Sequence, residues 1–194
     1  MRNFFSILAF IILFLSFSCN NDNSKPFVTI SGVIKNSKDS VLTIVSGKVN
    51  KKIKVSPEGK FSDTLYVEKA KIYRMHLNNS QKGFVFLNNG YNLKLDGDAN
   101  NFFYGFKYLG EGADSNNLLI SQHNYSKNVG SPQDFIKLNR EDYNIKVKKV
   151  TRDIDSINNL FKKADTVLIN ISNNNKDRFL TIIDQMYHQT YDFQ

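Results

Sequence analysis

The sequence predicts an α+β fold: an N-terminal antiparallel β-sandwich or barrel-like domain of about eight strands, followed by a long helix and a shorter helix that form an αα-hairpin. Short apolar runs separated by turn signals fill residues 27–110, with no amphipathic run of helical length among them. Beyond residue 110 the apolar spacing changes from alternation to steps of three and four. We therefore expect a β domain over 27–110 and a helical region over 111–194.

Eight segments in the first half have the composition of β-strands. In one of them Ile53 alternates with Lys52 and Lys54, with the period of two that a half-buried strand requires. Turn-forming residues separate the segments, most clearly Asn88–Gly90, whose asparagine–glycine pair is typical of a tight hairpin. The predicted strands are residues 27–34, 41–46, 49–55, 60–67, 71–78, 83–87, 91–95 and 101–109.

Helical patterns occupy the second half. Leu118–Ser126 has the length of a short helix, and Asp114 or Ser115 is placed to cap its first turn. Pro132 suits the first turn of a much longer helix, because its fixed φ is already helical. The polar run 172–177 is expected to end that long helix.

The long helix carries a regular apolar seam. Steps of four and three, typical of heptads, connect Tyr143, Val147, Val150, Ile154, Ile157, Phe161, Ala164, Leu168 and Ile171. A shorter final helix, predicted from Arg178 onward, can fold back on this seam as an αα-hairpin. Because it is shorter, part of the seam would stay uncovered, and the strand domain, self-association or a protein partner would then cover it.

The N-terminus has the pattern of an export signal. Arg2 supplies a positive start, and Phe4–Phe17 is an apolar run that is too short for a comfortable membrane span. We predict a lipoprotein signal peptide over residues 1–18. Residues 19–26 are polar and contain Pro26, so we predict that they form a tether.

Cys19 is the single cysteine of the chain. A lone cysteine can be a catalytic thiol, half of a disulfide, a buried apolar side chain or a lipid attachment point. Its place directly after the apolar run and before the polar tether favours lipid attachment at Cys19 as the first residue of the mature protein. An acylated sulfur is a thioether, so no thiol would remain for redox chemistry.

Positive charge is concentrated in the first half of the chain. Residues 20–110 hold 14 basic and 7 acidic side chains, whereas residues 111–194 hold 11 of each. Nucleic acid is not an expected partner, because no basic motif with interleaved aromatic residues or glycines accompanies the charge. Solvated lysines on strand edges, or a basic face beside an anionic membrane surface, account for the excess.

No motif points to a metal, a cofactor or a catalytic group. Asp96–Asn100 resembles the opening of a calcium-binding loop, but Asn101 and Lys107 stand where that loop requires glycine and glutamate. The three histidines are far apart in the sequence and form no short-range ligand pair. We therefore expect a protein that is not an enzyme and that carries no cofactor and no metal.

The order of four landmarks resembles a family of bacterial envelope lipoproteins. In that family an N-terminal domain of unknown function precedes a thioredoxin-like domain of the thiol–disulfide interchange type. The landmarks are Ile30–Ile34, Ser56–Phe61, Phe86–Asp98 and Leu109–Leu119, and a long charged helix followed by a second helix completes the pattern. The resemblance implies a lipid-anchored protein of the cell envelope, expected at the outer membrane and facing the periplasm.

Two features depart from the family. Ser16 and Phe17 replace the leucine and the small residue that usually precede the acylated cysteine, whereas Ser18 fits the pattern. The thioredoxin-like domain with its C-x-x-C pair is not found in the sequence, so no catalytic residue of the family can be transferred. The resemblance thus implies a non-catalytic, lipid-anchored accessory module. The alternative is a free-standing envelope lipoprotein that binds a ligand or a partner.

Overall fold

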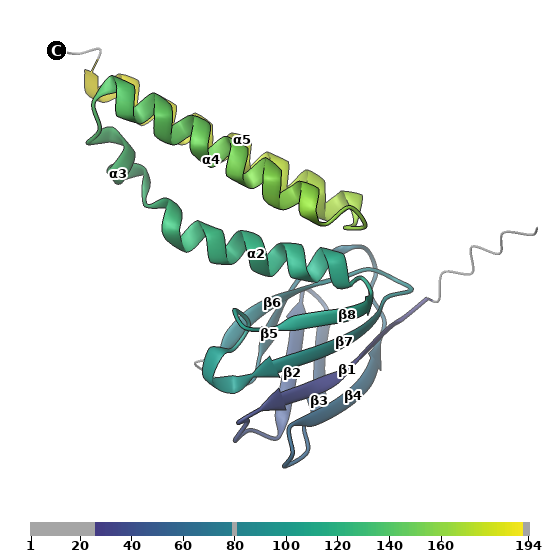
Figure 1. Ribbon diagram of the computed structural model, residues 1–194. Coiled ribbons are helices and arrows are strands. Elements are labelled where there is room, and N and C mark those ends of the chain that lie inside the picture. The colour runs from purple at the N-terminus through teal and green to yellow at the C-terminus, as the bar shows by residue number, and fades with distance from the viewer. Residues whose placement is uncertain (1–25, 79–80, 192–194) are drawn as a thin grey trace, which may run out of the picture.

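A computed structural model describes residues 26–78 and 81–191, in which a two-layered β-sandwich carries a layer of helices at one end (Figure 1). The predicted α+β fold with eight strands is therefore confirmed. The strands are β1 (Val28–Lys35), β2 (Val41–Ser46), β3 (Val49–Lys54), β4 (Lys60–Leu65), β5 (Lys71–His76), β6 (Lys82–Leu87), β7 (Asn92–Asp98) and β8 (Lys107–Glu111).

The strands form two four-stranded sheets, with the orders β4-β1-β7-β8 and β3-β2-β5-β6. Neighbouring strands are antiparallel except β1 and β7, which pair in parallel with Gly32 opposite Leu95. The sandwich is therefore mixed rather than purely antiparallel. The chain crosses between the sheets after β1, β3, β4 and β6. An ion pair also joins the two sheets, because Lys51 Nζ on β3 lies 2.7 Å from a carboxylate oxygen of Asp63 on β4.

The core lies between the two sheets because each strand buries alternate side chains. On β2, Leu42 and Ile44 are fully buried while their neighbours are half-exposed. Ile53 and Met75 on the flanking strands β3 and β5 point into the same layer. Burial of the branched and aromatic side chains of this cluster supplies the main stabilisation of the sandwich.

The last predicted strand, 101–109, is wrong over its first half. A short 3₁₀ helix (η2, Ala99–Asn101) and a turn precede β8. Phe102 and Phe103 are both buried, although a strand directs consecutive side chains to opposite faces. The chain achieves this with a left-handed backbone at Phe103, where φ is 69°.

Four helices follow the sandwich in the described part of the chain. The helix α2 leads away from the sheets and the short α3 turns the chain; α4 then runs back toward the sandwich, and α5 runs alongside α4 in the opposite direction, so that the two form an antiparallel hairpin (Figure 1). The predicted αα-hairpin is thus confirmed. The bounds are α2 (Ala113–Val129), α3 (Pro132–Ile136), α4 (Arg140–Leu160) and α5 (Thr166–Tyr191).

The predicted starts of these helices differ from the observed ones. The helix α2 is longer than predicted and begins after Gly112, whose φ of 88° lets the chain turn without a side-chain cap, so capping by Asp114 or Ser115 is wrong. Pro132 begins only the five-residue α3. The long helix α4 begins instead after Asn139, whose side chain accepts a hydrogen bond from the amide of Asp142.

The predicted turn of the hairpin is also misplaced. It lies at 161–165 rather than at 172–177, and Asn173–Asn175 are helical. Asparagine costs a helix only a few tenths of a kcal/mol per residue, whereas Asp165 caps α5 by accepting a hydrogen bond from the amide of Val167. As a result α5, with 26 residues, is longer than α4, with 21, which reverses the predicted order.

The seam of α4 faces other helices of the same chain. The ring of Tyr143 stacks on that of Tyr187 with centroids 3.8 Å apart, and both side chains are buried. Val150 is buried in the same cluster as Ile183 of α5. Leu168, which was predicted to continue the seam, belongs to α5 and packs on Phe86 of β6. Self-association through this seam stays a prediction.

Candidate functional site between the first helix and the hairpin

Two asparagines attach α2 to both sheets. The side chain of Asn116, which is fully buried, accepts a hydrogen bond from the amide of Phe86 (2.8 Å) and donates one to its carbonyl (2.9 Å). Asn117 makes the same pair of bonds with the backbone of Tyr108, both 2.9 Å long. Phe86 and Tyr108 lie on β6 and β8, so α2 provides hydrogen-bond partners for one edge strand of each sheet.

The turn of the hairpin is fixed to the same end of the sandwich through Asp165. One oxygen of its carboxylate caps α5, and the other accepts a hydrogen bond from Asn88 (2.8 Å) and a longer one from the Tyr91 hydroxyl (3.3 Å). The amide of Asp165 donates to the hydroxyl of Ser115, which is fully buried at the start of α2. Burial, opposed in part by the Ser115 hydrogen bond, raises the pKa of Tyr91 to about 12.

These contacts place α2 opposite the hairpin and leave a half-open cleft of about 340 Å³ between α2, α4 and α5. Its volume is within the range of small-molecule sites. Aliphatic and aromatic groups make up most of its wall, and the apolar side chains that line it are Leu119, Val129, Val150, Ile154, Ile157 and Phe179.

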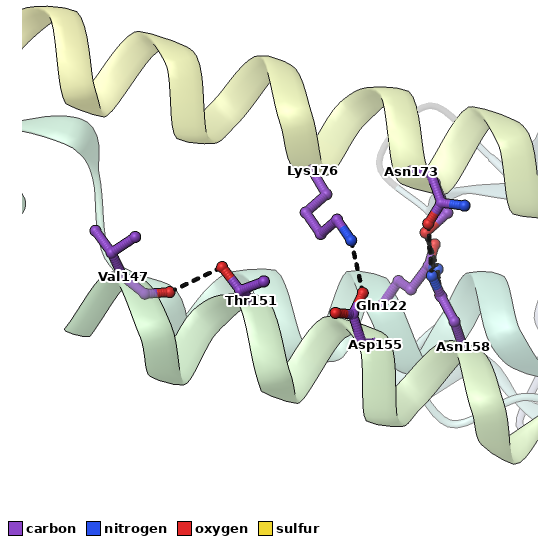
Figure 2. A network of polar contacts seen from close by, with 8 residues as sticks. Gln122, Val147, Thr151, Asp155, Asn158, Asn173 and Lys176 are labelled. Carbon is purple, nitrogen blue, oxygen red and sulfur yellow. Dashed lines mark hydrogen bonds and ion pairs between the residues drawn. The ribbon is translucent and has the colours of Figure 1, made fainter. Parts of the chain in front are cut away.

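A polar network closes one side of the cleft (Figure 2). The amide of Gln122 donates to Asn158 Oδ1 (2.6 Å) and to Ser172 Oγ (2.5 Å), which joins α2 to α4 and α5. Lys176 Nζ lies 2.6 Å from a carboxylate oxygen of Asp155, and the lysine side chain is only 15% exposed. These groups satisfy one another, so the network holds the three helices at a fixed spacing.

His123 and Tyr125 of α2 also line the cleft. The ring of His123 packs against Phe103 and Tyr104, with centroids 5.2 and 5.4 Å away. Burial and then the nearby charge of Lys127 lower the pKa of His123, which keeps the imidazole neutral at pH 7. Burial and a hydrogen bond to Asp153 raise the pKa of the Tyr125 hydroxyl to about 12, so this group also stays neutral.

The described residues bring no nucleophile, base and orienting group together in this cleft. The histidines lie apart on β5, α2 and α5, as His76, His123 and His188. Within residues 26–78 and 81–191, no three histidine, cysteine or acidic side chains come close enough to hold a metal ion. The aliphatic wall of the cleft has the composition of a site that buries an apolar surface.

The acidic stretch that resembles a calcium loop has local partners. The carboxylate of Asp98 accepts hydrogen bonds from the Asn36 side chain and the Asn100 amide, each 2.8 Å long. Both hydrogen bonds lower the pKa of Asp98, and the bond from Asn36 has the larger effect. Asp96 lies 3.5 Å from Lys35 of the neighbouring strand. Both acids therefore stabilise a turn and a strand pair.

Cys19, the predicted lipidation site, lies outside the described residues, as do the predicted signal peptide and most of the tether. Among the helices of the described part, none combines the length and the apolar character needed to cross a bilayer. The sequence pattern does not single out the groups that fix the site, namely Asn116, Asn117 and Asp165. The polar run that precedes Leu118 was the available signal, because polar residues at the start of an amphipathic helix often bind backbone groups.

No protein-family model matches the chain, and no curated protein matches it either. Among solved structures, the crystal structure of a DUF3823 family protein from Bacteroides ovatus ATCC 8483 is similar, with a TM-score of 0.26 and 10% sequence identity. The similarity spans 36% of this chain and 42% of that chain, so it covers less than half of either protein.

Proposed function

We propose that the protein is a non-catalytic, lipid-anchored module of the cell envelope and the N-terminal accessory part of a thiol–disulfide interchange-type lipoprotein. The observation that carries the proposal is the setting of Cys19, directly after a short apolar run and nine residues before the first strand of the sandwich. A sandwich whose first strand begins at Val28 is the arrangement expected of a domain tethered at its N-terminus.

The proposed lack of redox activity follows from the chemistry of this cysteine. Thiol–disulfide exchange needs a thiolate to attack and a second thiol to resolve the mixed disulfide. Cys19 is the single cysteine of the sequence, and acylation would consume its sulfur. Anchoring, spacing or binding is then the role left to the described sandwich and helices.

Replacing Cys19 by alanine is expected to move the full chain from the membrane fraction to the soluble fraction and to abolish incorporation of labelled fatty acid. The adjacent Ser18→Ala variant is the matched control, since it changes the same segment and keeps the sulfur. Retention of both label and membrane association by Cys19→Ala would overturn the anchor. Reduction of insulin disulfides by the purified wild-type chain would overturn the non-catalytic assignment.

The cleft favours a second function, the binding of a small, mainly apolar molecule by a free-standing lipoprotein. Its volume of about 340 Å³ suits a ligand of this kind, and its aliphatic walls would bury most of the ligand surface. The polar network beside Gln122 would orient one polar end of such a molecule.

Filling the cleft tests this second function. Ile154→Phe adds volume to the cleft wall, so it should displace any small molecule that native mass spectrometry detects on the purified wild-type chain. Ile145→Phe on the same helix is the control, because Ile145 is 58% exposed and lies outside the cleft. A bound molecule that persists in Ile154→Phe, or no bound molecule in wild type, would argue against the cleft as a ligand site.

A further inference from the structure

The two sheets of the sandwich differ sharply in charge. The strands β2, β3, β5 and β6 contain six lysine or arginine residues and no aspartate or glutamate. The strands of the other sheet contain four of each sign. The positive excess of the first half of the sequence is therefore concentrated on a single sheet.

Strand register places most of this charge on the outer face of the sheet. Thr43 on β2 pairs with Lys52 on β3 and with His76 on β5, and His76 pairs with Lys82 on β6. These four residues thus form one row across the sheet. Because neighbouring strands lie about 4.8 Å apart, the backbones of Lys52 and Lys82 are separated by roughly 14 Å.

Two further cations flank this row on the same face. Lys54 pairs with Val41, and Arg74 pairs with Val45, each two residues from the row along its strand. We call the exposed side chains Lys52, Lys54, Arg74 and Lys82 the basic face.

No carboxylate among the described residues lies within 4.0 Å of a cation of the basic face. Lys51, which alternates to the inner side, is the lysine of β3 that pairs with an acid, Asp63. Asp39 lies at the margin of the face, where its carboxylate accepts a hydrogen bond from Asn78. The cations therefore keep their charge available to an external anion.

We propose that the basic face is a docking surface for the anionic lipid headgroups of a membrane. The outer face of a sheet is broad. Lys82 lines an open hollow together with Thr43 and His76, whereas Lys52, Lys54 and Arg74 lie outside this hollow, so the cations are spread over the face.

Val41, Thr43 and Val45 lie between them on β2 and are half-buried. Phe84, which pairs with Arg74, is half-buried because its ring packs on Phe103 and His123. Among the described residues the face therefore offers no fully exposed aromatic platform of the kind that a single-stranded nucleic acid needs. Dispersed cations match a planar array of phosphates.

The proposal rests on the proposed lipid anchor. The segment between Cys19 and the first strand is long enough for the anchored protein to place its basic face on the membrane. Phe27 is eight residues from Cys19, and an extended chain of eight residues spans at most about 28 Å. The two sheets of a sandwich are about 10 Å apart. An anchor attached ahead of β1 could therefore hold the opposite, basic sheet against the same membrane.

Binding to vesicles by the full chain carrying Cys19→Ala tests the face independently of acylation. The probes are vesicles of phosphatidylcholine alone and vesicles with added phosphatidylglycerol, at 50 and 500 mM salt. We expect stronger binding to the anionic vesicles at low salt, because each surface cation adds roughly a fivefold factor in partition and salt screens it. Lys52→Gln, Arg74→Gln and Lys82→Gln together should reduce this anionic binding by about a hundredfold.

The control removes the same charge from the other sheet, through Lys60→Gln, Lys94→Gln and Lys107→Gln, all exposed lysines. We expect a change of less than about fivefold in this control, because these lysines lie opposite the basic face. Equal loss in both triple variants, or equal binding to neutral and anionic vesicles, would overturn the proposal. Binding to soluble heparin but not to anionic vesicles would also overturn it. If the acylated wild-type chain were found in the soluble fraction, this result would contradict the proposed lipid anchor but not the basic face.

Discussion

Replacing Asn116 by leucine is expected to lower the free energy of unfolding by about 3–5 kcal/mol. The substitution keeps the size of the side chain but leaves the backbone amide and carbonyl of Phe86 without partners, and each unpaired buried group costs about 1–3 kcal/mol. Thermal unfolding should shift by roughly 10 °C for a protein of this size. Hydrogen exchange at the Phe86 amide should accelerate, because this amide donates directly to the lost side chain.

Asn128→Leu is the matched control for this experiment. Asn128 lies on the same helix α2, is exposed, and donates only to the carbonyl of Asn124 one turn earlier. We expect a change within about 0.5 kcal/mol, as for other surface substitutions. If Asn116→Leu cost no more than this control, the asparagine would not be the link between α2 and the edge strand β6.

Gly59→Ala is expected to destabilise the sandwich by roughly 3 kcal/mol. Gly59 has a φ of 78°, which costs an alanine about 1–2 kcal/mol, and an added Cβ would lie 2.1 Å from the carbonyl oxygen of Ile34. The turn cannot move away from Ile34 without breaking a hydrogen bond, because the Ile34 amide donates to the Gly59 carbonyl (2.9 Å). Equilibrium unfolding in urea measures the loss as a lower midpoint with an unchanged slope.

Gly47→Ala measures how much of the Gly59→Ala destabilisation comes from the left-handed backbone rather than from the steric clash with Ile34. Gly47 also has a left-handed backbone, with a φ of 57°, but an added Cβ would meet only the Lys71 Nζ, at 3.8 Å. We therefore expect a loss of about 1 kcal/mol, which reports the backbone conformation alone. Equal losses at Gly59 and Gly47 would show that the contact with Ile34 is relieved by movement of the turn.

The attachment of the helices explains why the sandwich and the helical region act as one unit at their junction. Asn116 and Asn117 extend the hydrogen bonding of one edge strand of each sheet, and Asp165 adds a link from the hairpin turn to Asn88. Exposed strand edges invite pairing with other chains. By covering one edge of each sheet near the junction, the helix α2 protects the sandwich and at the same time forms one wall of the cleft.

The strands could be predicted because their signals are local. The alternation around Ile53 lies within a few residues and is confirmed as β3. Asn88–Gly90 does form a turn between β6 and β7, but these strands belong to different sheets, so the predicted hairpin is wrong, because a local turn signal does not record which strands pair. The strand prediction for the residues before β8 is wrong because the cause of their burial is not local. Phe102 and Phe103 are buried together by contacts with distant parts of the sandwich, which no alternating pattern records.

The hairpin turn shows how two local signals can compete. The polar run 172–177 predicts a break, but its asparagines are only weakly unfavourable in a helix. Asp165 followed by Thr166 was the stronger signal, since an aspartate can cap a helix, and the structure uses it so. The cleft was not predictable at all, because its walls come from three helices whose spacing depends on this turn.

The sequence by itself determined the fold class, the two-part division into strands and helices, and the concentration of positive charge in the first half. These properties follow from periodicity and composition, which act over a few neighbouring residues. The tertiary structure alone decided which strands share a sheet, and hence that the lysines of β3 and β6 form a face with Arg74 of β5. It also decided where α2 attaches, because hydrogen bonds from Asn116 to Phe86 join residues 30 positions apart.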